Sequence, residues 1–216
     1  MRVLVVFAHP SHDGFDGAIL ARGVAALMSA GHEVDVLDLY GEGFDPLLSA
    51  EEWAVNSDVP QNRATVAAEV ARLERAEALV LIFPTWWSGV PAALKGLLDR
   101  VFLPGVAFEL GANRAPPLTH LRVFCVVTTG GASRLVTLYL GDPLRWLMRA
   151  VRVACASPAR RRRARSSCGC TTWTRPARRH APVSSIRLRS VWRGWPSVRA
   201  ASSARPRPWP RAGSGS

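Results

Sequence analysis

Residues 78–102 of this 216-residue chain read ALVLIFPTWWSGVPAALKGLLDRVF, and this stretch decides the fold that we predict. Its first six residues are all apolar, which is typical of a parallel strand buried on both faces. Its last dozen residues place leucines and a valine at intervals of three or four, which indicates a helix with one apolar face. A buried strand, a short loop and an amphipathic helix together predict one unit of a parallel α/β sheet.

The same alternation extends over residues 1–153. Strands are expected at residues 2–7, 33–39, 78–83 and 122–127, and helices at residues 18–28, 62–73, 91–102 and 143–151. We therefore predict an α/β three-layer sandwich whose parallel sheet has the strand order 2-1-3-4 and right-handed crossovers. Such sheets bind ligands beyond the carboxyl ends of their strands, so the loops after strands one, three and four are the informative ones.

Charge divides the chain into two parts. Residues 1–153 hold all 16 acidic residues and 13 of the 28 basic ones, whereas residues 154–216 hold the other 15 basic residues, every one an arginine. Pro, Ser, Ala and Trp accompany these arginines without an apolar face, which predicts a disordered tail and a sheet that lacks its fifth edge strand. A basic tail with tryptophans would also suit nucleic acid, but the absence of a folded nucleic-acid module disfavours that function.

The composition of the tail is also what GC-rich DNA gives when it is read out of register, and we predict a shifted frame that starts between residues 154 and 168. Residues 168–174 must be encoded by TGY GGN TGY ACN ACN TGG ACN. Read from the third base, these codons become YGG NTG YAC NAC NTG GAC. That frame allows Trp-Leu-Tyr-Asp-Met-Asp, which suits an edge strand that ends in a polar turn. The alternative is a genuine disordered tail.

The first informative loop spans residues 8–18 and reads AHPSHDGFDGA. The helix that follows offers free N–H groups at its start, which suit a phosphate, and His9 and Ser11 would add donors. Neither GxGxxG nor GxxxxGK[ST] occurs here, so a Rossmann dinucleotide loop and a P-loop are disfavoured. The alternative is an ordinary loop in which Asp16 is the N-cap of the helix.

The other two loops carry aromatic rings and exposed backbone. Residues 83–91 read FPTWWSGVP, and two adjacent tryptophans beyond a buried strand offer flat surfaces on which a ring system can stack. Residues 127–133 read VTTGGAS, in which paired glycines expose N–H groups beside hydroxyls. Each loop alone is compatible with a simple turn, and it is their convergence on one sheet edge that predicts a binding site.

Residues 83–102 resemble the signature of the NAD(P)H dehydrogenase (quinone) family. Ala8-His9-Pro10 with Phe15, and Thr128-Thr129-Gly130-Gly131, are similar to the other two flavin loops of that family. The resemblance covers residues 1–153 and implies a flavodoxin-like fold. It also implies a flavin-dependent oxidoreductase with ping-pong transfer from NAD(P)H to a quinone, with FMN preferred to FAD, in a homodimer.

The resemblance further implies which residues hold the flavin. Those expected around its phosphate and ribityl chain are His9, Ser11, Phe15, Asp16 and Ala18. Those expected to line the isoalloxazine are Pro84, Thr85, Trp86 and Trp87, and those expected to bond to its polar edge are Thr129, Gly130 and Gly131. No acid–base residue is assigned, because the spacing of Tyr139 and Asp142 identifies no role for either.

The chain departs from the family in two places. The family usually has Ser-Phe-Asn where this chain has Gly14-Phe15-Asp16, and a carboxylate so close to the expected phosphate should weaken binding unless it caps the helix. The last strand and helix of the family have no counterpart after residue 153. Some relatives look like ancillary subunits of potassium-efflux transporters, which gives a regulatory alternative to the enzyme.

Cysteine and hydropathy patterns set the remaining expectations. The four cysteines form no CxxC pair and no His/Cys ligand spacing, so we expect no metal. The apolar start of the chain runs directly into Ala8-His9-Pro10 without a cleavage pattern, which predicts a buried strand rather than a signal peptide. No apolar run reaches the roughly 18 residues of a membrane span, so we expect a cytoplasmic protein.

Overall fold

The computed structural model describes residues 1–109, 117–132, 134–154 and 170–174. In chain order the elements are β1 (Arg2–Phe7), α1 (Phe15–Ser29), β2 (Glu33–Asp38), α2 (Ala50–Ala54), η1 (Gln61–Val66), α3 (Ala67–Arg75), β3 (Ala78–Pro84), α4 (Ala92–Arg100), η2 (Pro117–His120), β4 (Val123–Gly130), α5 (Arg134–Tyr139), α6 (Pro143–Ala154) and β5 (Cys170–Thr174). The two η segments are short 3₁₀ helices.

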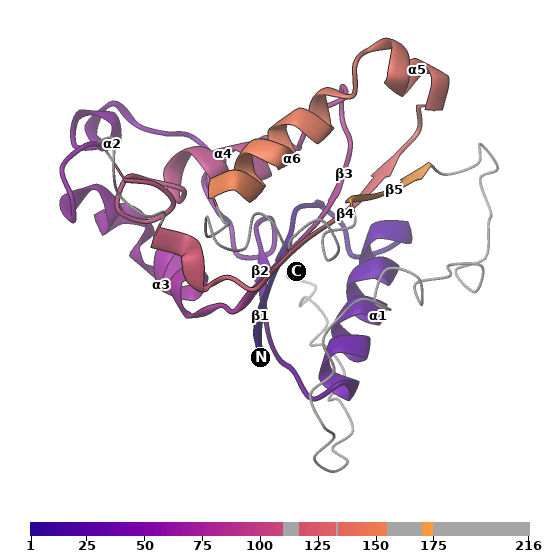
Figure 1. Ribbon diagram of the computed structural model, residues 1–216, viewed down its shortest axis with the longest axis horizontal. Helices are drawn as coiled ribbons and strands as arrows, with labels where there is room; N and C mark the ends of the chain where they lie inside the picture. The colour runs from indigo at the N-terminus through magenta and orange to yellow at the C-terminus, as the bar shows by residue number, and fades with distance from the viewer. Residues whose placement is uncertain (110–116, 133, 155–169, 175–216) are drawn as a thin grey trace, which may run out of the picture.

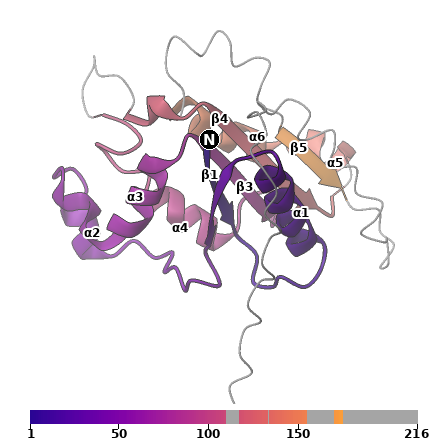
Figure 2. The ribbon, with the colours of Figure 1, turned by 90° about the horizontal axis from the view of Figure 1, so that it is seen from below.

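The strands form one parallel sheet in the order β2-β1-β3-β4-β5. Helix α1 covers one face, and α3, α4 and α6 cover the other (Figure 1, Figure 2). This confirms the α/β three-layer sandwich and the order 2-1-3-4 of its first four strands. It also brings the ends of β1, β3 and β4 to the same edge of the sheet.

Two apolar cores explain why the central strands are hydrophobic without alternation. On one face, Val3, Val5 and Phe7 of β1 pack in a cluster with residues of α1, while Leu4 and Val6 pack in a second cluster with α3, α4 and α6. Because successive side chains of a strand point to opposite faces, a strand covered on both faces must be apolar at every position. The sequence pattern of residues 2–7 and 78–83 follows from this.

The fifth strand corrects one expectation. The sheet was expected to lack an edge strand, yet β5 pairs with β4 from Val126 opposite Cys170 to Gly130 opposite Thr174. Cys-Thr-Thr-Trp-Thr is rich in β-branched and aromatic residues, which favour strands, and the open edge of β4 offers free backbone groups. The composition of the whole tail therefore did not predict this short strand within it. The rest of the expected disordered tail lies outside the described residues.

The connection between β2 and α3 also differs from the expected single helix over residues 62–73. The structure places the 3₁₀ helix η1 before α3, and the side-chain amide of Asn62 donates to the backbone oxygens of Asn56 (3.0 Å) and Pro104 (2.9 Å). These two bonds fix the start of η1 to the chain before it and to Pro104. Among the residues with assigned structure, no helix has the length and apolar character needed to cross a membrane.

Candidate functional site

The loops after β3 and β4 are joined directly at the carboxyl edge of the sheet. The backbone N–H of Thr85 donates to the carbonyl of Thr129 at 2.6 Å, which continues the ladder between the two strands by one residue. The hydroxyls of Thr85 and Thr128 are hydrogen-bonded at 2.7 Å. Thr128 and Thr129 are both buried, so these bonds fix the point at which the two loops leave the sheet.

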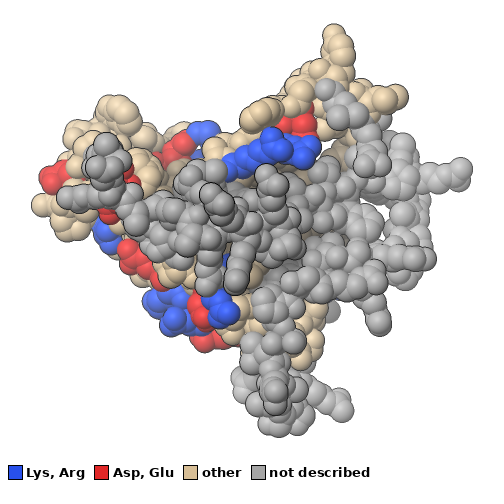
Figure 3. Space-filling model, viewed as in Figure 1, with Lys and Arg blue, Asp and Glu red and all other residues tan. Residues whose placement is uncertain are grey.

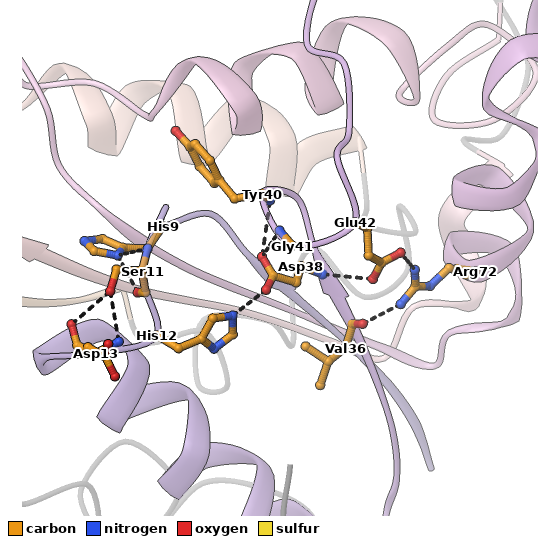
Figure 4. Close-up of polar contacts among 10 residues, drawn as sticks. All are labelled: His9, Ser11, His12, Asp13, Val36, Asp38, Tyr40, Gly41, Glu42 and Arg72. Atoms are coloured by element: carbon orange, nitrogen blue, oxygen red, sulfur yellow. Dashed lines mark hydrogen bonds and ion pairs between the residues drawn. The ribbon is translucent and has the colours of Figure 1, made fainter. Parts of the chain in front are cut away.

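The loop after β1 is folded on itself by its own polar groups. Nδ1 of His9 lies 2.7 Å from the carbonyl oxygen of Ser11 and 3.0 Å from its backbone nitrogen (Figure 4). The hydroxyl of Ser11 accepts from the backbone N–H of Asp13 at 3.0 Å. The ring of His9 also lies beside that of Trp86, with centroids 6.4 Å apart, which connects this loop to the loop after β3.

Asp16 joins the loop after β1 to the loop after β4. The hydroxyl of Thr129 donates to Oδ1 of Asp16 at 2.9 Å. Burial raises the pKa of the Asp16 carboxyl, although the Thr129 hydrogen bond and the nearby charge of His9 act in the opposite direction. The residue that caps α1 is Gly14, without a side-chain hydrogen bond, so the alternative in which Asp16 is the N-cap is wrong.

These contacts close a circuit around one edge of the sheet. The loop after β1 contacts the loop after β3 through His9 and Trp86, the loop after β3 contacts β4 through Thr85, and β4 returns to α1 through Thr129 and Asp16. Three segments far apart in the sequence thus define one small region, as the convergence argument predicted.

The two tryptophans lie at the tip of a tight turn rather than in the core. Trp86 and Gly89 exchange backbone hydrogen bonds of 3.2 and 2.9 Å, and Trp87 and Ser88 both have positive φ, at 51° and 60°. Bulky residues seldom adopt this conformation, and strain of this kind is concentrated at functional sites. Trp86 is 42% exposed and Trp87 is fully exposed, so both rings are accessible.

Five of the expected site residues remain. Gly130 is the last residue of β4, and Gly131 follows it. A Cβ built on Gly131 would meet no atom within 4 Å, which leaves open space beside its backbone. Phe15 packs against the core under α1, and Pro84 is buried at the end of β3, so these two shape the loops from beneath. Ala18 is half-buried in the second turn of α1.

One contact of the first loop was not anticipated. Nε2 of His12 lies 2.5 Å from Oδ2 of Asp38, the last residue of β2, and the other carboxylate oxygen accepts from the backbone N–H groups of Tyr40 and Gly41 (Figure 4). This contact fixes the loop after β1 to the end of β2. A buried acid at the end of a strand that reaches the ligand edge was the signal that could have revealed it.

The residues of the circuit fit a flavin. Two exposed indoles can stack on a flat ring system, while the backbone of Gly131 lies next to open space where a polar ring edge would be accommodated. A Cβ on Gly14 would likewise meet nothing within 4 Å, which leaves space for an anion beside the residue that caps α1, whereas the backbone of His12 lies against Gly17 in its first turn. These groups together suit an organic cofactor that has a flat ring and an anionic end.

A groove of about 400 Å³ lies elsewhere, between the segment that holds α2 and the 3₁₀ helix η1, with Arg100 at the end of α4 beside it. Its polar walls include Glu52 and Arg100, which are joined by an ion pair of 2.6 Å. Because these charges already satisfy each other, and because the groove shares no residue with the three loops, we place the functional site at the loops.

The fold and the site define a flavodoxin-like α/β protein with a ligand edge formed by the loops after β1, β3 and β4. The sequence profile of the flavodoxin-like fold family matches residues 1–147, and the chain belongs to that family. It is 31% identical over 154 residues to NAD(P)H dehydrogenase [quinone] 1 of Cavia porcellus, a match that covers 63% of this chain and 56% of the relative. The chain thus spans little more than half the length of that relative.

Solved structures give the same picture. The chain is similar to NAD(P)H:quinone oxidoreductase from Methanothermobacter marburgensis, with a TM-score of 0.68 and 27% identity over 90% of this chain and 92% of the other. It is also similar to Smu.1420 from Streptococcus mutans UA159, with a TM-score of 0.65 and 29% identity over 81% and 87% of the two chains.

Proposed function

We propose that this chain is a flavin-dependent oxidoreductase that transfers reducing equivalents from NAD(P)H to a quinone or a similar small acceptor. The observation that carries the proposal is the closed circuit of contacts among the three loops, with two exposed tryptophans beside it. The names of the relatives, NAD(P)H dehydrogenase [quinone] 1 and NAD(P)H:quinone oxidoreductase, support the same chemistry.

In this proposal the residues of the chain bind and position the cofactor, and the cofactor would carry out the hydride transfer. The start of α1, with His9 and Ser11, receives the phosphate, while Trp86 and Trp87 provide the stacking surface. Thr129 and the backbone of the two glycines bond to the polar edge of the ring. A bound flavin supplies hydride acceptance and donation, which no side chain of this chain can perform. We propose FMN before FAD, because the three loops provide for one ring, one ribityl chain and one phosphate.

The exposed stacking surface also supports a ping-pong order. The exposed surface beside Trp86 and Trp87 would hold the nicotinamide and the acceptor in turn. NAD(P)H is a cytoplasmic reductant, and we therefore propose the cytoplasm as the location. No acid or base from the chain is assigned to the transfer.

An apolar face next to the site supports a homodimer. Leu135, Val136, Tyr139 and Leu140 of α5 and its end are exposed, and Figure 3 shows this projecting part of the molecule mainly in tan, with charged residues beside it. Apolar patches of this kind mark protein interfaces. We propose a second copy of this chain as the occupant. The transporter-subunit alternative would place the transporter on this face instead.

An absorption spectrum followed by a redox titration tests the proposed function. The purified chain, reconstituted with FMN and separated from free flavin, should be yellow and should bleach under anaerobic conditions when NADH or NADPH is added. Addition of benzoquinone should restore the colour. Failure to retain FMN, or a retained FMN that neither nucleotide bleaches, would contradict the proposal.

A further inference from the structure

Asp16 is an acidic side chain placed inside the site that is proposed to receive a phosphate. It lies in the first turn of α1 and is fixed there by the Thr129 hydroxyl, which donates to Oδ1 at 2.9 Å from the end of β4. The carboxylate therefore cannot turn away into solvent without breaking the bond that closes the circuit. Its charge and the charge of a bound phosphate would lie at the same end of the same helix.

Two features of the same turn act in opposite directions on an anion. Gly14 caps α1 and contributes no side-chain hydrogen bond to its first turn, where backbone N–H groups attract an anion. A negative charge on Asp16 cancels that attraction, because two like charges a few ångströms apart repel strongly when they are partly shielded from water. The balance depends on whether Asp16 carries its proton.

We propose that Asp16 is a specificity-determining residue that couples the binding of a phosphorylated flavin to the uptake of a proton. When the Asp16 carboxyl is neutral, a phosphate can bind beside it. When the carboxyl is ionised, its charge repels the phosphate. A flavin without a phosphate is insensitive to this switch. The inference rests on the proposed function, since it requires that a flavin phosphate binds at the start of α1.

The surroundings of Asp16 support this assignment. Among the described residues, His9 from the loop after β1 is the ionisable group that acts on it, and Thr129 contacts it from β4. Burial raises the pKa of Asp16, which moves the ionisation of the carboxyl toward neutral pH, and a nearby phosphate would raise it further. Phosphate affinity should therefore fall as the pH rises through the pKa of Asp16.

Equilibrium titrations of FMN and riboflavin from pH 5 to pH 8 test the proposal on the full chain. At pH 8, Asp16→Asn should bind FMN about tenfold more tightly than the wild type, and the difference should shrink as the pH falls through the pKa of Asp16. Riboflavin should bind both proteins equally at every pH. Asp13→Asn is the matched control, because this acid lies in the same loop but is exposed, and it should behave as the wild type does.

A second variant, Thr129→Val, tests the same proposal if Asp16→Asn does not fold. The Thr129 hydrogen bond lowers the pKa of Asp16, so Thr129→Val should shift the fall in FMN affinity to higher pH, whatever its effect on absolute affinity. A ratio of wild-type to Asp16→Asn affinity that stays constant with pH, or an equal change for riboflavin, overturns this inference alone. If neither flavin binds any of the proteins, the proposed function fails with it.

Discussion

At the scale of single residues, Glu52 is the best example of a charge whose surroundings dictate its chemistry. Burial opposes its ionisation, but hydrogen bonds from Arg100, from the backbone of Ser49 and from the hydroxyl of Thr65 outweigh burial and lower the Glu52 pKa to about 2. Both members of the Glu52–Arg100 pair are only 11% exposed. The pair fixes the segment between β2 and α3 onto α4.

The Glu52–Arg100 pair predicts how stability depends on pH. Because the folded-state pKa of Glu52 lies below its ordinary value of 4.5, the pair stabilises the fold fully above pH 4.5 and loses that contribution as the pH falls toward 2. Arg100→Met should cost about 3 kcal/mol of unfolding free energy at pH 7, because a shielded carboxylate is left without its partner. Urea unfolding at pH 7 and pH 3 measures both effects.

The exposed pair between Lys95 and Asp99 on α4 is the matched control for this prediction. Removing it with Lys95→Met should change the unfolding free energy by about 0.5 kcal/mol or less, because exposed pairs are screened by water. A loss at Arg100 no larger than the loss at Lys95 would contradict the account of the Glu52 pair.

At the scale of elements, Gly96 shows why α4 carries a glycine in its interior. A Cβ at this position would lie 2.3 Å from the backbone of Pro46, which belongs to the segment before α2. Alanine normally favours a helix by about 1 kcal/mol over glycine, so Gly96→Ala should stabilise if propensity decided. We expect it to destabilise by 1 to 3 kcal/mol, roughly the cost of overpacking, as measured by thermal or urea unfolding.

The elements also show what the sequence could and could not predict. The first four strands follow from short apolar runs, and α1, α4 and α6 follow from apolar periodicity. Helices α2 and α5 are short and largely exposed, so they leave almost no periodic pattern. Strand β5 was missed because its five residues are surrounded by arginine-rich sequence, and its partner β4 is what makes it a strand.

The candidate site was predictable for a different reason. Loops after parallel strands converge on one edge whatever their sequence, so topology alone placed His9, Trp86 and Thr129 together. The bond from Thr129 to Asp16 could not be predicted, and the contact between His12 and Asp38 was signalled only by an acid at the end of a strand. They depend on side-chain directions within loops, which have no periodicity.

At the scale of the whole molecule, the abrupt change of composition after residue 153 supports our proposal of a shifted reading frame. The alternative codons begin at the last base of Cys168 and end within Thr174, so they cover the stretch in which β5 lies. Resequencing the gene tests this. We expect one alternative frame to stay open across residues 154–216 with apolar periodicity and a normal share of acids. If neither frame does so, the basic tail is genuine.

The central claim is that the three loops form a flavin site, and a fluorescence titration with FMN at pH 6 tests it most directly. The wild-type chain should bind one FMN, Trp87→Ala should lose about 1 kcal/mol or more of binding free energy, and Trp53→Ala should bind as the wild type does. Trp53 is the matched control because it is also an exposed tryptophan, but on α2. Equal FMN affinity in Trp87→Ala and the wild type would contradict the placement of the flavin at these loops.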